Sequence, residues 1–159
     1  MRGLAAAVLG VALCSVVYAQ KAKDEGWSQL LPPGDGRQAV LESCTTCHNL
    51  KVVVEARLSR AAWTKDVNDM IQRGAPLFPE EIDPITTYLS KVFGPDVPKL
   101  VNVNTASREE LEKLPGLKPD IVSKILEARP FRNSEQLRRA VGAEKAEFEK
   151  VQYLVKYRD

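Results

Sequence analysis

The chain has 159 residues, a formal net charge of +2, 3 cysteines and 1 histidine. The length fits one ordinary domain or two small ones, and so few cysteines exclude a disulfide framework. The charge is unevenly placed, because residues 20–98 hold 9 Lys and Arg against 11 Asp and Glu, whereas residues 99–159 hold 13 against 10. This modest asymmetry favours an acidic partner for the second half.

The first residues predict a secretory signal peptide over residues 1–19. Arg2 supplies a positive charge, an apolar run follows it, and Ala19 is the small residue before a cut at Gln20. The run is shorter than the roughly 20 residues that span a membrane, and an uncleaved anchor is the alternative. We therefore expect a periplasmic or extracellular protein with no transmembrane segment in its mature chain, whose remaining cysteines are Cys44 and Cys47.

A polar lead-in over residues 20–35 ends in turn-forming residues and precedes a helix that leads into the cysteines. Asp35 is the predicted N-cap of that helix. Apolar side chains at helical spacing over residues 58–71 predict a second helix, with Ser59 as its N-cap and Gly74 after its end.

A third helix is predicted from about residue 79 or 80 to residue 92. Two prolines and a glycine then make a stiff connector, and we place a domain boundary there. The predicted division is a first domain over residues 36–95, a linker over residues 96–100 and a second domain over residues 101–159.

The second domain contains two similar units, each of which begins with a capping residue and continues with a short helix, a glycine and another helix. Ser107 and Glu110 have the spacing of a capping box, and Asn133 or Ser134 can cap the later unit. No long stretch of the sequence alternates apolar and polar residues as a β-strand does, so the sequence predicts an all-α protein.

The motif Cys44-Thr45-Thr46-Cys47-His48 allows three interpretations: a redox dithiol, part of a zinc site, or a covalently attached haem. A zinc site needs a second ligand pair, and His48 is the only histidine. A thioredoxin-like dithiol belongs beside a βαβ pattern, which this sequence lacks. Cys-x-x-Cys-His is the attachment signature of c-type haem, in which two thiols on one side of a turn form thioethers and the histidine binds the iron. The sequence therefore predicts one covalent haem c on Cys44 and Cys47, with His48 as an axial ligand.

The second axial ligand cannot be another histidine. Met70 is the one methionine left once Met1 is removed with the signal peptide, and a thioether ligand raises the reduction potential relative to a second imidazole. Met70 also shares the apolar face of its predicted helix with Trp63 and Val67, where a core methionine is the alternative.

The segment WTKDVNDMIQRGAPLFPEEIDPITTYLSKVFGP resembles the compact c-type haem domains of quinohaemoprotein dehydrogenases and related exported bacterial cytochromes. The resemblance covers about residues 36–95. It implies a small cytochrome c-like fold in which Met70 is the distal iron ligand and Trp63 and Tyr88 line or pack the haem pocket.

The run VNVNTASREELEKLPGLKPDIVSKILEAR resembles the tandem helix-hairpin-helix module of bacterial competence DNA receptors (ComEA-like), over about residues 100–155. In that family the hairpin glycines let the backbone approach DNA phosphates without reading sequence. This chain departs from the favoured Gly-x-Gly, since its turns read Gly116-Leu117-Lys118 and Gly142-Ala143-Glu144. Glu144 puts a carboxylate where a phosphate would sit.

Basic residues in this half could form a phosphate-facing patch, and a solvated helical surface is the alternative. The same fold also serves protein contacts alone, as in an extrinsic lumenal subunit of photosystem II. The candidate DNA contacts are Gly116, Lys118, Lys124, Gly142 and Lys145, and Arg129, Arg132, Arg138 and Arg139 extend the patch.

The predicted function is an exported mono-haem electron carrier whose helix-hairpin-helix module docks it to a redox partner protein or assembly. We do not expect an enzyme, because no substrate-converting constellation is visible and the single histidine is already assigned to the iron. The alternative is a DNA-binding protein without sequence preference that carries a haem.

Overall fold

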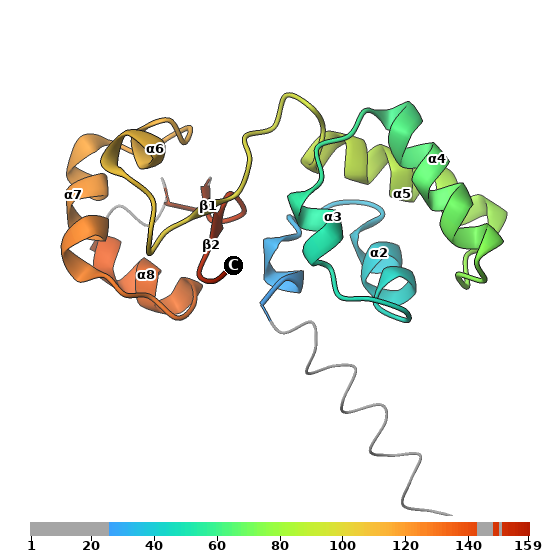
Figure 1. The fold of residues 1–159 in the computed structure, drawn as a ribbon, viewed down its shortest axis with the longest axis horizontal. Helices are drawn as coiled ribbons and strands as arrows, with labels where there is room; N and C mark the ends of the chain where they lie inside the picture. The colour runs from blue at the N-terminus through green and yellow to red at the C-terminus, as the bar shows by residue number, and fades with distance from the viewer. Residues whose placement is uncertain (1–25, 143–147, 150) are drawn as a thin grey trace, which may run out of the picture.

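The computed structural model of the chain describes residues 26–142, 148–149 and 151–159. The predicted signal peptide, residues 20–25 of the lead-in, and residues Glu144 and Lys145 lie outside the described residues. Helices dominate, and Figure 1 shows them in two groups joined by an extended segment. In chain order the elements are η1 (Ser28–Leu30), α2 (Arg37–Cys44), α3 (Lys51–Glu55), α4 (Arg60–Gln72), α5 (Pro79–Val92), β1 (Val101–Asn102), α6 (Arg108–Glu112), α7 (Pro119–Ala128), α8 (Ser134–Val141) and β2 (Val155–Lys156).

The first group of helices has a core of its own, built around the long pair α4 and α5. These two helices pack against each other, and α2 packs against α5 (Figure 1). The Ser59 side chain accepts a hydrogen bond of 3.3 Å from the Ala62 N–H, which confirms the predicted cap of α4. Pro79 begins α5, in agreement with the predicted start of the third helix.

The start of α2 differs from the prediction, because Gly36 rather than Asp35 is its N-cap. Gly36 has a φ of +90°, and a Cβ at this position would lie 2.6 Å from the Pro84 carbonyl oxygen of α5. The chain therefore enters α2 so close to α5 that it needs a glycine there. The local sequence pattern could not predict this contact, because it joins segments that are distant in the chain.

The second group of helices surrounds a separate core. Ser107 accepts from the Glu110 N–H while the Glu110 carboxylate accepts from the Ser107 N–H, which confirms the predicted capping box at α6. Asn133 caps α8 by accepting from the Gln136 N–H at 3.0 Å. Positive φ at Gly116 forms the turn between α6 and α7.

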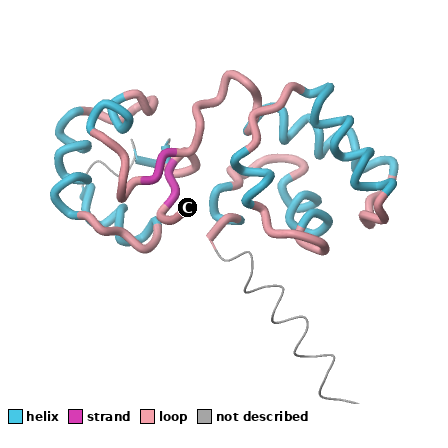
Figure 2. Tube along the Cα trace, in the orientation of Figure 1, coloured by secondary structure: helices cyan, strands magenta, loops and turns pink. Residues whose placement is uncertain are grey.

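A two-stranded parallel ladder ties the beginning of this group to its end. Val101 pairs with Val155 and Asn102 with Lys156. The two strands are the magenta segments in Figure 2. The described fold is thus mostly helical, as predicted, apart from this short ladder. Strands of two residues are too short to produce an alternating pattern in the sequence.

Polar contacts join the two groups. Lys156 Nζ lies 2.9 Å from Glu55 Oε1, and the Arg57 guanidinium donates to the backbone carbonyls of Val97 and Pro98 in the connector. The buried apolar residues form two separate clusters, one on each side of that connector. No helix in the described part of the chain has both the length and the apolar character needed to cross a bilayer.

Candidate functional site

The cysteine motif opens onto a cavity of about 300 Å³ in the first group of helices. The end of α2 and the turn after it form one side, and α4, the loop after α4, and α5 form the rest. Four predicted haem residues, Cys44, Cys47, His48 and Met70, all line this cavity. The other lining residues are Ser43, Thr46, Val67, Arg73, Ala75, Leu77 and Ile85.

Two threonine hydroxyls hold the turn that carries the cysteines. Thr45 Oγ1 donates to the Leu41 carbonyl and Thr46 Oγ1 donates to the Ser43 carbonyl, each at 2.7 Å. Cys44 is half-buried, Cys47 is exposed, and neither is joined in a disulfide. Within the described ranges, no three His, Cys, Asp or Glu side chains gather closely enough to hold a metal ion directly. The two thiols and the imidazole therefore share a cavity without converging on one point.

His48 is oriented by a backbone hydrogen bond. Its Nδ1 lies 2.8 Å from the carbonyl oxygen of the adjacent residue, Asn49. A carbonyl only accepts, so this contact selects the tautomer in which Nδ1–H donates and Nε2 keeps its lone pair. Histidines that ligate metals are commonly held in this way, with the second ring nitrogen bonded to a carbonyl.

Met70 lies on α4, one turn after Val67, and is only partly buried. Its carbonyl oxygen accepts from the N–H groups of Arg73 and Ala75, each at 3.0 Å, and these bonds turn the chain at the end of α4. The core interpretation of Met70 placed it fully inside the protein. The structure instead places it at the wall of the cavity that the cysteine motif also lines.

Among the lining residues that the sequence did not assign to the site are Arg73, Leu77 and Ile85. Arg73 follows Met70 by three residues at the helical spacing that brings side chains to one face, which was a usable signal. Leu77 lies in a loop and Ile85 on α5, so only the tertiary fold could place them here. Arg73 is the one cationic residue in the described lining of this cavity.

The two aromatic residues assigned to the haem pocket do not line the cavity. Trp63 is buried and donates from Nε1 to the Phe93 carbonyl at 3.3 Å. Tyr88 is buried and donates its hydroxyl to the Pro32 carbonyl at 2.6 Å, and burial raises the pKa of this phenol. Both pack in the same core as Val67, behind the lining residues, so a haem role for them stays a prediction.

The hairpin residues in the second group lie at two turns. Gly116 has a φ of +88° and Gly142 a φ of +62°, and both are exposed. Lys118 is the N-cap residue of α7, and Lys124 lies on the same helix; both side chains are exposed. The fifth candidate contact, Lys145, lies outside the described residues.

The predicted basic patch is smaller than the sequence suggested. Arg129 turns inward and donates to the carbonyls of Val103 and Ala106, and burial lowers the pKa of its guanidinium. Arg138 and Arg139 both pair with Glu135 on α8. Among the described residues, Arg129, Arg138 and Arg139 are therefore already bonded, because the fold supplies backbone and carboxylate acceptors that linear spacing does not reveal.

Comparison with known families places a helix-hairpin-helix motif at residues 98–156. This match covers the whole of the second group, from the connector to β2. The cysteine motif and its cavity lie outside it. No curated protein and no solved structure matches the chain.

Proposed function

We propose that the chain is an exported mono-haem c-type cytochrome that carries electrons and docks to a redox partner through its helix-hairpin-helix module. One observation carries the proposal: Cys44, Cys47, His48 and Met70, chosen from the sequence as haem attachment residues and iron ligands, line a single cavity. They come from α2, the turn after it and α4, so chain proximity alone does not bring them together.

The donor set fits a covalent haem. Cys44 and Cys47 would hold the haem through thioether bonds to its two vinyl groups. His48 would bind the iron through Nε2, because the Asn49 carbonyl holds its Nδ1. Met70 would offer its thioether sulfur to the iron. When bound, the haem iron would take up and release one electron.

The remaining lining supports electron carriage rather than catalysis. Val67, Leu77 and Ile85 make an apolar wall that limits water at the iron, which helps to set a reduction potential. With His48 and Met70 both bound to it, the iron would have no open position for oxygen or peroxide. Arg73 offers a cation to a carboxylate of the haem periphery.

A docking role for the second group is supported by its charges. The inward Arg129 and the Glu135 pairs of Arg138 and Arg139 leave fewer cations for phosphates than the sequence predicts. Asp120 also lies in the first turn of α7, directly after the first hairpin. A carboxylate there offsets the helix dipole that would otherwise favour a phosphate.

DNA binding is the second candidate, because the helix-hairpin-helix match and the positive φ of Gly116 and Gly142 favour it. A salt titration of the full mature chain with duplex DNA separates the two roles. Each cationic side chain that contacts a DNA phosphate releases counterions. The affinity for DNA should therefore fall steeply as the salt concentration rises if about three phosphates are contacted. If the chain does not bind DNA at low salt, docking to a protein partner is the remaining role of the helix-hairpin-helix module. Tight, salt-sensitive DNA binding that Lys118→Gln and Lys124→Gln weaken would establish the DNA role.

Covalent attachment is tested by intact mass and by denaturing gels with haem detection, after export in cells that mature c-type cytochromes. The mature wild type should carry the mass of one haem through denaturation. Cys44→Ala with Cys47→Ala should lose it, while Thr87→Ala, an exposed change on α5, should not. A wild-type protein that folds and is exported without haem would overturn the proposal.

A further inference from the structure

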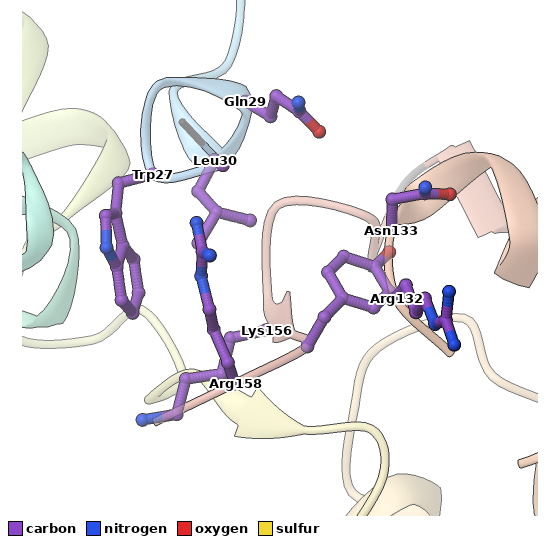
Figure 3. Close-up of a pocket in the computed structure, with 9 residues that line it drawn as sticks. Trp27, Gln29, Leu30, Arg132, Asn133, Lys156 and Arg158 are labelled. Atoms are coloured by element: carbon purple, nitrogen blue, oxygen red, sulfur yellow. The ribbon is translucent and has the colours of Figure 1, made fainter. Parts of the chain in front are cut away.

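A second cavity, of about 280 Å³, lies between the two cores (Figure 3). One wall consists of residues 26–30, which precede α2. The other comes from residues 132–133, at the start of α8, and residues 156–158 around β2. None of the residues that line the haem cavity lines this one, so the two sites are distinct.

The charged side chains in the described lining all have the same sign. They are Arg132, Lys156 and Arg158, and no carboxylate is among the residues that line the cavity. Lys156 is neutralised in part by its ion pairs with Glu55 at 2.9 Å and Asp159 at 3.2 Å. The exposed Arg132 side chain makes no hydrogen bond or ion pair within the described part of the chain. The cavity is therefore electrostatically complementary to an anion.

Asn133 adds hydrogen-bond donors at the same wall. Its side-chain oxygen accepts from the Gln136 N–H, so its amide nitrogen keeps two donors for another partner. Asn133 caps α8, but the Glu135 carboxylate in the first turn of that helix offsets its dipole, so the attraction for an anion comes from Arg132, Lys156 and Arg158. In Figure 3, Asn133 and Arg132 lie on the opposite side of the cavity from Trp27.

The first wall is apolar and closely packed. Trp27 and Leu30, which are 7% and 4% exposed, present hydrophobic surface to the cavity. The Arg158 guanidinium lies against Gly26, where a Cβ would come within 2.9 Å of its Nη2 atom. A glycine at this position, with a φ of +101°, lets the cation approach the backbone of the first wall.

We propose that this cavity binds a small organic anion whose phosphate or carboxylate head contacts Arg132, Arg158 and Asn133, and whose short apolar body rests on Trp27 and Leu30. The volume suits this size of ligand, because one water takes about 30 Å³ and small-molecule sites begin near 300 Å³. The walls belong to different cores, so a bound anion links them and stabilises the folded protein by mass action. The proposal does not depend on the haem.

Calorimetric titration of the full mature chain tests the site with four probes: phenyl phosphate, benzoate, inorganic phosphate and benzyl alcohol. We expect one saturable site for phenyl phosphate or benzoate, weaker binding of inorganic phosphate and none of the neutral alcohol. The ranking of the first two identifies the head group. Arg132→Gln should weaken the better probe about tenfold, as loss of a charge-assisted contact does.

The matched control is Arg139→Gln, which removes an exposed arginine of α8 that does not line the cavity. It should leave the affinity unchanged. Equal weakening by both substitutions would show general attraction to a basic surface and overturn the site. Absence of saturable binding by either aromatic anion, or binding of benzyl alcohol as tight as that of phenyl phosphate, would also overturn it.

Discussion

Met70 lies in the last turn of α4 and Arg73 caps the end of that helix, and both line the cavity that the cysteine motif opens onto. In the proposed haem protein, Met70 would offer a neutral sulfur to the iron and Arg73 would place a fixed positive charge near it. A ligand acts through a bond and a charge acts through space, so substitutions at these two positions should have separable effects on a bound haem.

Met70→Ala should abolish the weak far-red absorption that marks a methionine–iron bond in the ferric protein. The reduction potential should fall as well, because a thioether ligand stabilises the ferrous state. Optical spectra and redox titration measure both effects. Val67→Ala is the control, since it shortens a side chain of the same cavity that has no ligand atom. A far-red band that survives in Met70→Ala would disprove the assignment.

Arg73→Gln should lower the reduction potential of the haem-loaded protein. A positive charge near the iron disfavours the additional positive charge of the ferric state, so its removal favours oxidation. Arg73→Lys should restore most of the loss. Arg60→Gln removes an arginine of the same helix that pairs with Asp83 away from the cavity and should change little. Equal potentials for Arg73→Gln and Arg60→Gln would contradict the role.

At the scale of elements, the contact of Gly36 with α5 decides how α2 brings the cysteines to the cavity. The neighbouring backbone leaves no room for a side chain at this helix start. The position of the motif therefore depends on one glycine as well as on the apolar face of α2.

Gly36→Ala should destabilise the protein by more than about 2 kcal/mol, because a positive φ and a clash with the Pro84 carbonyl add together. Gly74→Ala is the matched control, since it has a similar φ of +94° but nothing within 4 Å of the added carbon. It should cost only the backbone strain, about 1 kcal/mol. Urea denaturation of both variants compares them, and equal losses would show that the contact with α5 contributes nothing.

The helix ends show what local sequence can and cannot predict. Ser59, Ser107 and Asn133 act within three residues of themselves, and the structure confirms each as a cap. Asp35 failed as a cap because its neighbour meets α5, a contact between segments distant in the sequence. The prediction that Arg129 belongs to the basic patch is also wrong because of contacts between distant segments. Its acceptors, the carbonyls of Val103 and Ala106, lie more than twenty residues earlier in the chain.

On the scale of the whole molecule, two cores meet through a few polar contacts. The sequence predicted the connector but not the residues that join the cores across it. The ion pair of Glu55 with Lys156 links positions 101 residues apart, and no local pattern marks such a pair. Likewise, grouping Arg73, Leu77 and Ile85 at the cysteine cavity required the packing of α4, its loop and α5.

Glu55→Gln should reduce the free energy of unfolding by up to about 1 kcal/mol at neutral pH, the range for a partly exposed pair. The hydrogen bond that Lys156 donates to Glu55 raises the pKa of Lys156, so folded Lys156 holds its proton more tightly than the unfolded chain does. That stabilisation is complete below the unfolded lysine pKa and is lost as pH rises through the folded one. Denaturant titrations should therefore show wild type and variant converging at alkaline pH; a constant difference would contradict the account.

The central claim is that this chain is a covalent mono-haem electron carrier. Its most direct test is an optically monitored redox titration of the exported, mature, full-length protein, followed by exposure of the reduced form to carbon monoxide. We predict one wave of one electron per chain and no carbon monoxide adduct, because in the proposed haem protein His48 and Met70 would both bind the iron. A protein without a reducible chromophore, or one whose reduced form binds carbon monoxide readily, would contradict the claim.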